Sequence, residues 1–180
     1  MANRQVFTRQ KVGLRTPNLH RLTQRTAAQS LSQHRGFTDH WTGADGTLYK
    51  PDPIERLRGI QAYHMDTLGY GDIAYHAAYD GDGNIYFLRE HRWVGAHAAS
   101  PENVANIYTD GLVFLEDKRG MTTDGVWAWA HCRAFYRMTM GRDAHTYAHE
   151  YWGRMGPPAK PTECPGPYIV DMDRFFGGTV

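Results

Sequence analysis

Cysteine is scarce in this chain, with two residues in 180, Cys132 and Cys164. Two cysteines cannot form the multi-disulfide framework that stabilises many small secreted domains, and we expect no disulfide. Long apolar runs are also missing, since no stretch approaches the roughly 20 residues that a membrane-spanning helix needs. The N-terminus lacks the apolar block of a secretory signal. The sequence therefore predicts no stable membrane insertion.

Acidic residues are absent from the first 38 positions, which carry seven Lys and Arg residues. The other 13 basic residues and all 19 acidic residues follow. The formal net charge is therefore +7 for the first 38 residues and −6 for the remainder. Three interpretations are open: a flexible tail, an organelle transit peptide, or a patch attracted to an anionic polymer. We predict a basic N-terminal arm, residues 1–35, and one catalytic domain, residues 36–180, because 180 residues suit a single core.

Two segments have the signals of helices. Asp52 is a suitable cap, Pro53 suits the first turn, and apolar residues then recur at helical spacing until Gly69. Thr122 can cap a second helix that extends through Met138. Shorter helices are predicted within residues 22–31 and 168–176.

Strands are predicted where β-branched and aromatic residues alternate with small or polar ones. A hairpin joins residues 72–80 to residues 85–89 through an Asp-Gly-Asp-Gly-Asn turn. Residues 37–42 form a strand that ends at a turn over residues 43–46, residues 107–115 form another, and residues 94–98 form a loop. His40 therefore lies near the end of a strand.

Histidines precede a single cysteine in a Pro/Gly turn. His40, His97 and His149 come before Cys164, which lies in the string Thr-Glu-Cys-Pro-Gly. Imidazole nitrogen and thiolate sulfur are preferred zinc ligands, and a catalytic zinc ion keeps three protein ligands and an open position for water. His40, His149 and Cys164 would supply that set, with His145 as the alternative second histidine. Taken alone, a single histidine is more often structural, and a cysteine is often a small buried apolar residue.

Five blocks of sequence carry a family resemblance. They are residues 60–65 (Ile-Gln-Ala-Tyr-His-Met), 69–76 (Gly-Tyr-Gly-Asp-Ile-Ala-Tyr-His), 82–86 (Asp-Gly-Asn-Ile-Tyr), 94–98 (Val-Gly-Ala-His-Ala, with Asn103) and 162–166 (Thr-Glu-Cys-Pro-Gly). In order and approximate spacing, this set resembles the central part of zinc-dependent N-acetylmuramoyl-L-alanine amidases. That group includes phage endolysins and the peptidoglycan recognition proteins, and the likeness extends over residues 37–168.

The resemblance implies a fold, a metal and a set of residues. The fold is α/β, with a central mixed β-sheet flanked by α-helices. Zn²⁺ would be bound by His40, His149 and Cys164, Tyr75 would assist the chemistry, and Thr162 would lie beside the reacting carbonyl. The predicted substrate-binding residues are His97, Asn103 and Trp41, with orientation of a neighbouring side chain as the other role for His97. One departure is the string His-Trp-Thr after residue 39, where His-His-Thr is common in the family.

The implied activity is hydrolysis of the amide between N-acetylmuramic acid and L-alanine in bacterial peptidoglycan. We expect a monomeric phage endolysin, made in the host cytoplasm without a signal peptide and acting at the bacterial cell wall, with no nucleic-acid partner. One alternative is a non-catalytic peptidoglycan-binding module of the recognition-protein type. Another is an enzyme that acts on soluble cell-wall fragments.

Overall fold

The computed structural model describes residues 3–42, 52–115, 120–160, 162–175 and 177–180, and its core is one mixed sheet. Six strands within these residues are arranged in the order β1-β4-β3-β5-β2-β6. The strands are β1 (Val6–Phe7), β2 (Gly36–Trp41), β3 (Ala77–Asp80), β4 (Ile85–Phe87), β5 (Thr109–Leu115) and β6 (His145–Ala148). β3 and β4 pair antiparallel, and the other neighbours pair parallel.

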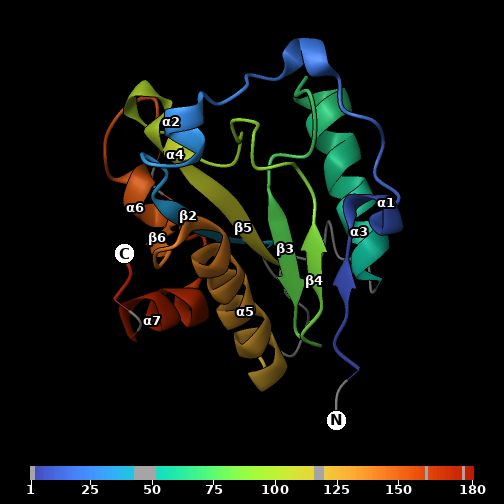
Figure 1. Cartoon of the computed structure of the whole chain (residues 1–180), viewed down its shortest axis with the longest axis vertical. Coiled ribbons are helices and arrows are strands. Elements are labelled where there is room, and N and C mark those ends of the chain that lie inside the picture. The colour runs from blue at the N-terminus through green and yellow to red at the C-terminus, as the bar shows by residue number, and fades with distance from the viewer. Residues whose placement is uncertain (1–2, 43–51, 116–119, 161, 176) are drawn as a thin grey trace.

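Helices cover both faces of the sheet (Figure 1). They are α1 (Arg9–Val12), α2 (Ala27–Ser30), α3 (Pro53–Ala62), α4 (Val104–Tyr108), α5 (Thr123–Met140), α6 (His149–Gly153) and α7 (Pro167–Phe175), with 3₁₀ turns η1 (Leu19–Arg21) and η3 (Pro101–Asn103) and a π-helical turn η2 (Tyr63–Thr67). One apolar cluster packs α5 against the sheet, and a second packs α3 against the opposite face. The predicted α/β fold with a central mixed sheet is confirmed. None of the helices in these residues combines the length and apolarity that a membrane crossing requires.

Strand β2 carries different chemistry on its two faces, because successive side chains of a strand point to opposite sides. Phe37 belongs to the cluster under α5, and Asp39 on the same face accepts a hydrogen bond from the Trp129 indole (3.0 Å). The Thr38 hydroxyl accepts from the Trp152 indole of α6 (2.9 Å), and His40 points to this second face. The alternation therefore directs His40 away from the core under α5.

The two long helices begin where their caps predict. The Asp52 carboxylate accepts from the Ile54 N–H (2.8 Å) at the start of α3, and the Thr122 hydroxyl accepts from the Gly125 N–H (3.0 Å) at the start of α5. Gly69 follows the π-helical turn η2 that continues α3, Gly141 follows α5, and both glycines have positive φ. The strand with His40 and the loop over residues 94–98 are likewise confirmed. The hairpin β3–β4 is also confirmed, although its first strand, predicted over residues 72–80, begins at Ala77.

Four further elements differ from the sequence expectations. The strand predicted over residues 107–115 begins at Thr109, because the Ser100 hydroxyl caps the Ala105 N–H (2.9 Å) and the chain is helical until Tyr108. Strands β1 and β6 were not predicted, since two to four residues give little periodic signal. The helix expected over residues 22–31 is reduced to Ala27–Ser30. The turn predicted over residues 43–46 lies outside the described residues.

The basic N-terminal segment lies along the rest of the chain and does not project as a free tail. Strand β1 pairs with β4, with Val6 opposite Ile85. The Arg9 guanidinium donates two hydrogen bonds to the buried Asp72 carboxylate (2.8 and 2.9 Å). Arg25 is 4% exposed, so its charge lies inside the protein. The domain boundary at residue 35 stays a prediction.

We expect Gly36→Ala to destabilise the fold by at least about 2 kcal/mol, through strain and close contact. Gly36 has φ +133°, and a Cβ there would lie 2.1 Å from the His145 carbonyl oxygen of β6. Gly141→Ala is the control, because Gly141 also has positive φ (+67°) but nothing within 4 Å of an added Cβ. Urea unfolding should give a loss of about 1 kcal/mol for the control. An equal or smaller loss for Gly36→Ala would contradict the tight β2–β6 pairing.

Candidate metal centre

Three predicted ligands come together at one end of the sheet. The β2–β6 register pairs Asp39 with Ala148, so the next residues, His40 and His149, lie side by side. Their ring centroids are 4.5 Å apart, and the His40 Nδ1 lies 3.6 Å from the Cys164 Sγ. One donor atom from each of these three residues lies within 4.8 Å of the other two. This spacing is suited to shared ligation of one ion.

Hydrogen bonds of the Cys164 backbone fix the turn that carries this residue. The Cys164 N–H donates to the Thr162 hydroxyl (3.1 Å), and its carbonyl accepts from the Glu150 N–H of α6 (2.8 Å). Gly166 has φ +81° and lies against the Trp41 ring, where a Cβ would come within 2.7 Å of a ring carbon. The thiol is therefore placed by contacts to α6 and to the end of β2.

The protonation states of the two histidines match metal binding, whereas the thiol would have to lose its proton to bind a metal ion. Burial lowers the pKa of His149 to about 4 and that of His40 well below its usual range, so both rings are neutral at pH 7. The His149 Nδ1 is buried and has no hydrogen-bond partner among the described residues, so this nitrogen is not engaged by the protein. Burial raises the pKa of the Cys164 thiol to about 12, and a bound cation is what would reverse this shift. Two imidazoles and one thiol form a donor set that fits zinc.

His145, the alternative ligand, lies elsewhere. Its Nε2 is 2.6 Å from the Thr179 hydroxyl, and its ring contacts Tyr147. The structure therefore brings His149, and not His145, to His40 and Cys164.

Two of the predicted assisting residues border the same cluster. The Tyr75 ring centroid is 5.1 Å from that of His40, and burial raises the pKa of Tyr75, so the phenol keeps its proton at neutral pH. Thr162 lies two residues before the cysteine and lines the neighbouring cleft. The Tyr75 ring thus packs beside one of the three ligands, and the Thr162 hydroxyl lies in the turn that carries another.

An open cleft of about 660 Å³ adjoins the cluster. Its walls include three of the predicted residues, His97, Asn103 and Thr162, together with His149 and Lys160. His97 also contacts the cluster directly, because its Nδ1 is 3.1 Å from the His40 Nε2. Trp41 does not join these lining residues and packs instead against Gly166 and the apolar cluster under α5.

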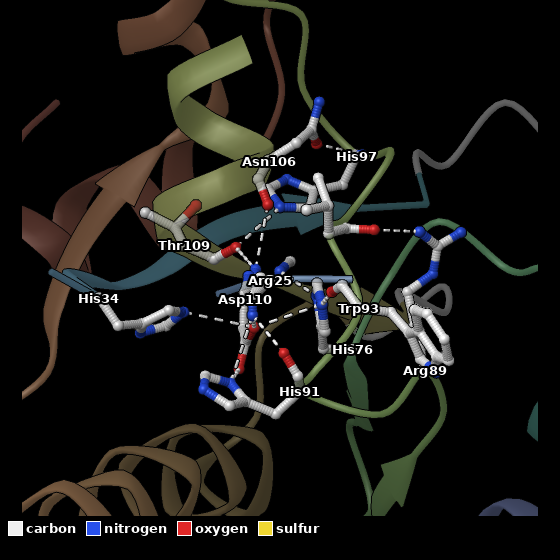
Figure 2. Close-up of polar contacts among 12 residues, drawn as sticks. Arg25, His34, His76, Arg89, His91, Trp93, His97, Asn106, Thr109 and Asp110 are labelled. Atoms are coloured by element: carbon white, nitrogen blue, oxygen red, sulfur yellow. Dashed lines mark hydrogen bonds and ion pairs between the residues drawn. The ribbon is translucent and has the colours of Figure 1, made fainter. Parts of the chain in front are cut away.

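A second group of histidines surrounds Asp110 of β5, and no sequence motif pointed to it (Figure 2). The Asp110 carboxylate lies 2.7 Å from the Arg25 guanidinium, 2.7 Å from the His91 Nδ1, 3.3 Å from the His76 Nε2 and 3.5 Å from the His34 Nε2. Burial alone raises the pKa of Asp110, but these neighbours outweigh it and hold that pKa well below its usual range.

The spacing of this second group also permits a metal ion, since donor atoms of His34, His91 and Asp110 lie within 4.8 Å of one another. Arg25 makes that interpretation unfavourable. Its NH1 is hydrogen-bonded to Asp110 and lies 3.4 Å from the His91 Nδ1, so a buried cation is already present. We interpret the group as an ionic cluster and not as a metal centre.

Similarity to known proteins is confined to part of the sequence. No protein-family model matches the chain. A 76-residue segment is 40% identical to peptidoglycan-recognition protein SC2 of Drosophila simulans and covers 42% of this chain and 41% of that protein. A 41-residue segment is 49% identical to N-acetylmuramoyl-L-alanine amidase of Homo sapiens, covering 23% of this chain and 7% of the human protein. The matched regions thus span less than half of these relatives.

Solved structures match over nearly the whole fold. Drosophila PGRP-LB, in a tyrosine-to-phenylalanine mutant in complex with tracheal cytotoxin, superposes with a TM-score of 0.75 at 20% identity and covers 97% of this chain and 96% of that chain. The complex of the PGRP-LCa and PGRP-LCx ectodomains with tracheal cytotoxin gives a TM-score of 0.76 at 20% identity, covering 97% and 98%. The fold is therefore that of the peptidoglycan recognition proteins.

These comparisons correct one expectation. The similar proteins come from insects and mammals, and they are recognition proteins and amidases. The prediction of a bacteriophage endolysin made in a host cytoplasm is therefore wrong. Its basis was the lack of an apolar N-terminal block, which carries no information about the source of a chain.

We predict that His91 stabilises the protein more at acidic than at alkaline pH. Its Nδ1 and Nε2 lie 2.7 Å from Asp110 and 2.8 Å from the Ser30 carbonyl, and both contacts favour the doubly protonated ring. Burial lowers the pKa of His91, but these acceptors outweigh it and leave the pKa raised. The contribution is therefore complete below about pH 6.5 and is lost as pH rises through the folded-state pKa.

The measurement compares wild type with His91→Gln by urea unfolding at pH 5.5 and pH 8.5. The loss of stability in the variant should be larger at pH 5.5. Wild-type stability alone is no test, because charging of His34 and His76, whose pKa values are lowered by burial, opposes folding in acid. Equal losses at both pH values would mean that folding does not raise the pKa of His91 and would contradict this prediction.

Proposed function

We propose that this chain is a zinc-dependent amidase of the peptidoglycan recognition protein type, which hydrolyses the amide between N-acetylmuramic acid and L-alanine in peptidoglycan. The observation that carries the proposal is the convergence of His40, His149 and Cys164 beside an open cleft. The relatives support the substrate class. One is named as this amidase, and solved neighbours are bound to tracheal cytotoxin, described for the PGRP-LE complex as monomeric diaminopimelic acid-type peptidoglycan.

His40, His149 and Cys164 would hold the zinc ion. When bound, zinc would supply a water of lowered pKa and polarise the amide carbonyl. His40 and His149 are neutral, so their lone pairs are available without loss of a proton. Of the three ligands, His149 lines the cleft, and the cleft leaves room for a substrate carbonyl on that side.

Tyr75 and Thr162 would act on the reacting carbonyl. The raised pKa of Tyr75 keeps its phenol protonated, so the O–H can donate to developing negative charge on oxygen without carrying a charge itself. The Thr162 hydroxyl accepts the Cys164 N–H, which leaves its own proton for donation into the cleft. Tyr75 can also guide the attacking water or relay its proton.

The cleft offers contacts for the glycan and peptide parts of the substrate. Asn103 uses its side-chain carbonyl to bind the Asn106 amide (2.7 Å), and its own NH₂ group is a candidate donor to the substrate. His97 and Lys160 border the same space. Trp41 was predicted to bind substrate, and in the proposed enzyme we assign it instead to supporting the Cys164 turn through Gly166.

A non-catalytic peptidoglycan-binding module is the second candidate. It is favoured by the recognition-protein names of the relatives with 40–48% identity. The enzyme is preferred because two neutral imidazoles and a partly buried thiol at ligating distance suit a metal ion, whereas binding of sugar and peptide alone does not require this combination. Activity on soluble muropeptides but not on intact walls would identify the third alternative, an enzyme for cell-wall fragments.

Metal removal should abolish the activity. We expect about one zinc ion per chain, loss of amide hydrolysis after chelation, and recovery when Zn²⁺ is added. Cys164→Ser should lose most zinc affinity, whereas Cys132→Ser is the matched control because Cys132 packs in the core under α5. Products should carry a new N-terminal alanine. New reducing ends would instead indicate a glycosidase, and tight wall binding without zinc or products would favour the binding module.

Tyr75→Phe should retain zinc and lose turnover. Removal of one donor to an oxyanion typically lowers kcat about 10²–10³-fold. The matched control is Tyr70→Phe, a tyrosine that lines the same cleft. Metal content and kcat should be measured on the same preparations. Full turnover in Tyr75→Phe would remove this phenol from the mechanism.

A further inference from the structure

Arg25 is buried although it comes from the basic N-terminal segment, and its guanidinium lies among several polar partners (Figure 2). Its side chain is 0% exposed, and its guanidinium donates to four acceptors. NH1 bonds Asp110 (2.7 Å) and the His91 carbonyl (2.6 Å), while NH2 bonds the carbonyls of Asn106 (3.0 Å) and Thr109 (2.7 Å). One planar group therefore ties the loop after β4 to the junction between α4 and β5.

The same junction holds the loop that carries His97. The Asn106 side-chain carbonyl accepts from the N–H groups of His97 (2.8 Å) and Ala98 (3.1 Å), and its NH₂ donates to the Ala98 carbonyl (2.7 Å). The Asn106 backbone carbonyl accepts from the Gly95 N–H (3.1 Å). A shift of Asn106 would therefore move this loop.

The His97 ring is enclosed by two residues without side chains. A Cβ on Gly95 would lie 2.5 Å from the His97 ring, and a Cβ on Gly111 would lie 2.6 Å from it. Because real Cβ atoms do not approach so closely, only glycine fits at either position. The His97 ring therefore has little freedom to rotate, and the positions of the neighbouring residues determine its hydrogen bonds.

Those hydrogen bonds select one tautomer. The His97 Nε2 lies 3.4 Å from the Thr109 carbonyl, which only accepts, so Nε2 carries the proton and Nδ1 has the lone pair. Nδ1 is 3.1 Å from the His40 Nε2 and therefore accepts from it. The His40 Nδ1 is then unprotonated and faces Cys164 (3.6 Å). A ligating histidine characteristically donates its second N–H in this way.

We propose that Arg25 is a positioning residue of the metal centre, which acts through the Thr109 carbonyl and Asn106 on His97 and thereby fixes the tautomer of His40. Thr109 offers one oxygen to both Arg25 and His97. Since the bond from His97 is long, a displacement of that oxygen by a few tenths of an ångström decides whether it persists. The inference rests on the proposed function for its metal, but the tautomers exist in the metal-free protein.

Arg25→Lys separates geometry from charge. Lysine keeps the positive charge opposite Asp110, so the buried carboxylate stays paired, but a point-like ammonium cannot reproduce the fork that reaches Thr109 and Asn106 together. Arg15→Lys is the matched control. Arg15 lies in the same segment and also bonds a carboxylate, that of Asp66, but this pair is exposed.

Three quantities should be measured on wild type and both variants: zinc affinity by competition with a chromophoric chelator, histidine tautomers of the metal-free protein by ¹H–¹⁵N NMR, and urea unfolding. We expect Arg25→Lys to bind zinc about 10–100-fold more weakly, as other changes behind a ligating histidine do. Its His97 should show a mixture of tautomers, and Arg15→Lys should match wild type. Unchanged zinc affinity and tautomer in Arg25→Lys, even with lowered stability, would overturn the proposal and leave Arg25 a purely structural residue.

The wild-type protein provides a test that does not depend on any variant folding. His97 must be the Nε2–H tautomer in the metal-free state. Finding the Nδ1–H tautomer would reverse the direction of the hydrogen bond to His40 and defeat the inference. Failure of wild type to bind zinc would instead defeat the proposed function, and the tautomers of wild type and Arg25→Lys would still decide whether Arg25 positions His97.

Discussion

The candidate metal centre depends on the parallel pairing of β2 with β6. In this register Asp39 is opposite Ala148, and the chain then continues as His40 in one strand and as His149 in the first turn of α6. A shift by one residue would turn His40 to the other face of the sheet, into the core under α5. Gly36 makes the register possible, because its missing side chain lets the β6 backbone approach.

The two histidine clusters in this protein differ in charge, because the cluster around Asp110 contains cations and the cluster around His40 contains neutral rings. Around Asp110, the charge comes from Arg25 and from His91, whose pKa is raised. Around His40, burial lowers the histidine pKa values, and neither an arginine nor a lysine bonds the cluster among the described residues. Neutral donors with a free lone pair can take a metal ion, whereas a site that already contains a guanidinium repels one.

The N-terminal segment contributes to the interior as well as to the surface. Arg9 neutralises Asp72, and Arg25 neutralises Asp110. The basic residues of the acid-free N-terminal segment thus pair with buried carboxylates elsewhere in the chain. This pairing gives a physical reason for the uneven distribution of charge along the sequence. Buried carboxylates need cationic partners, because an unpaired charge in the interior is costly. The guanidinium of Arg25 also links this segment to the loop that carries His97.

By itself, the sequence determined the long helices and the hairpin, and its family resemblance pointed to His40 and Cys164 as candidate ligands while leaving His149 and His145 open as the third. Caps such as Asp52 and Thr122 and the setting of Cys164 are local signals, and local signals can be read along the chain. The tertiary structure alone decided that His149 and not His145 lies beside His40, that Trp41 packs against Gly166, and that Arg25 and His97 share the Thr109 carbonyl. These placements depend on strand register and on contacts between residues far apart in sequence. Burial and hydrogen-bond geometry determine such contacts, and neither can be read from composition or local sequence.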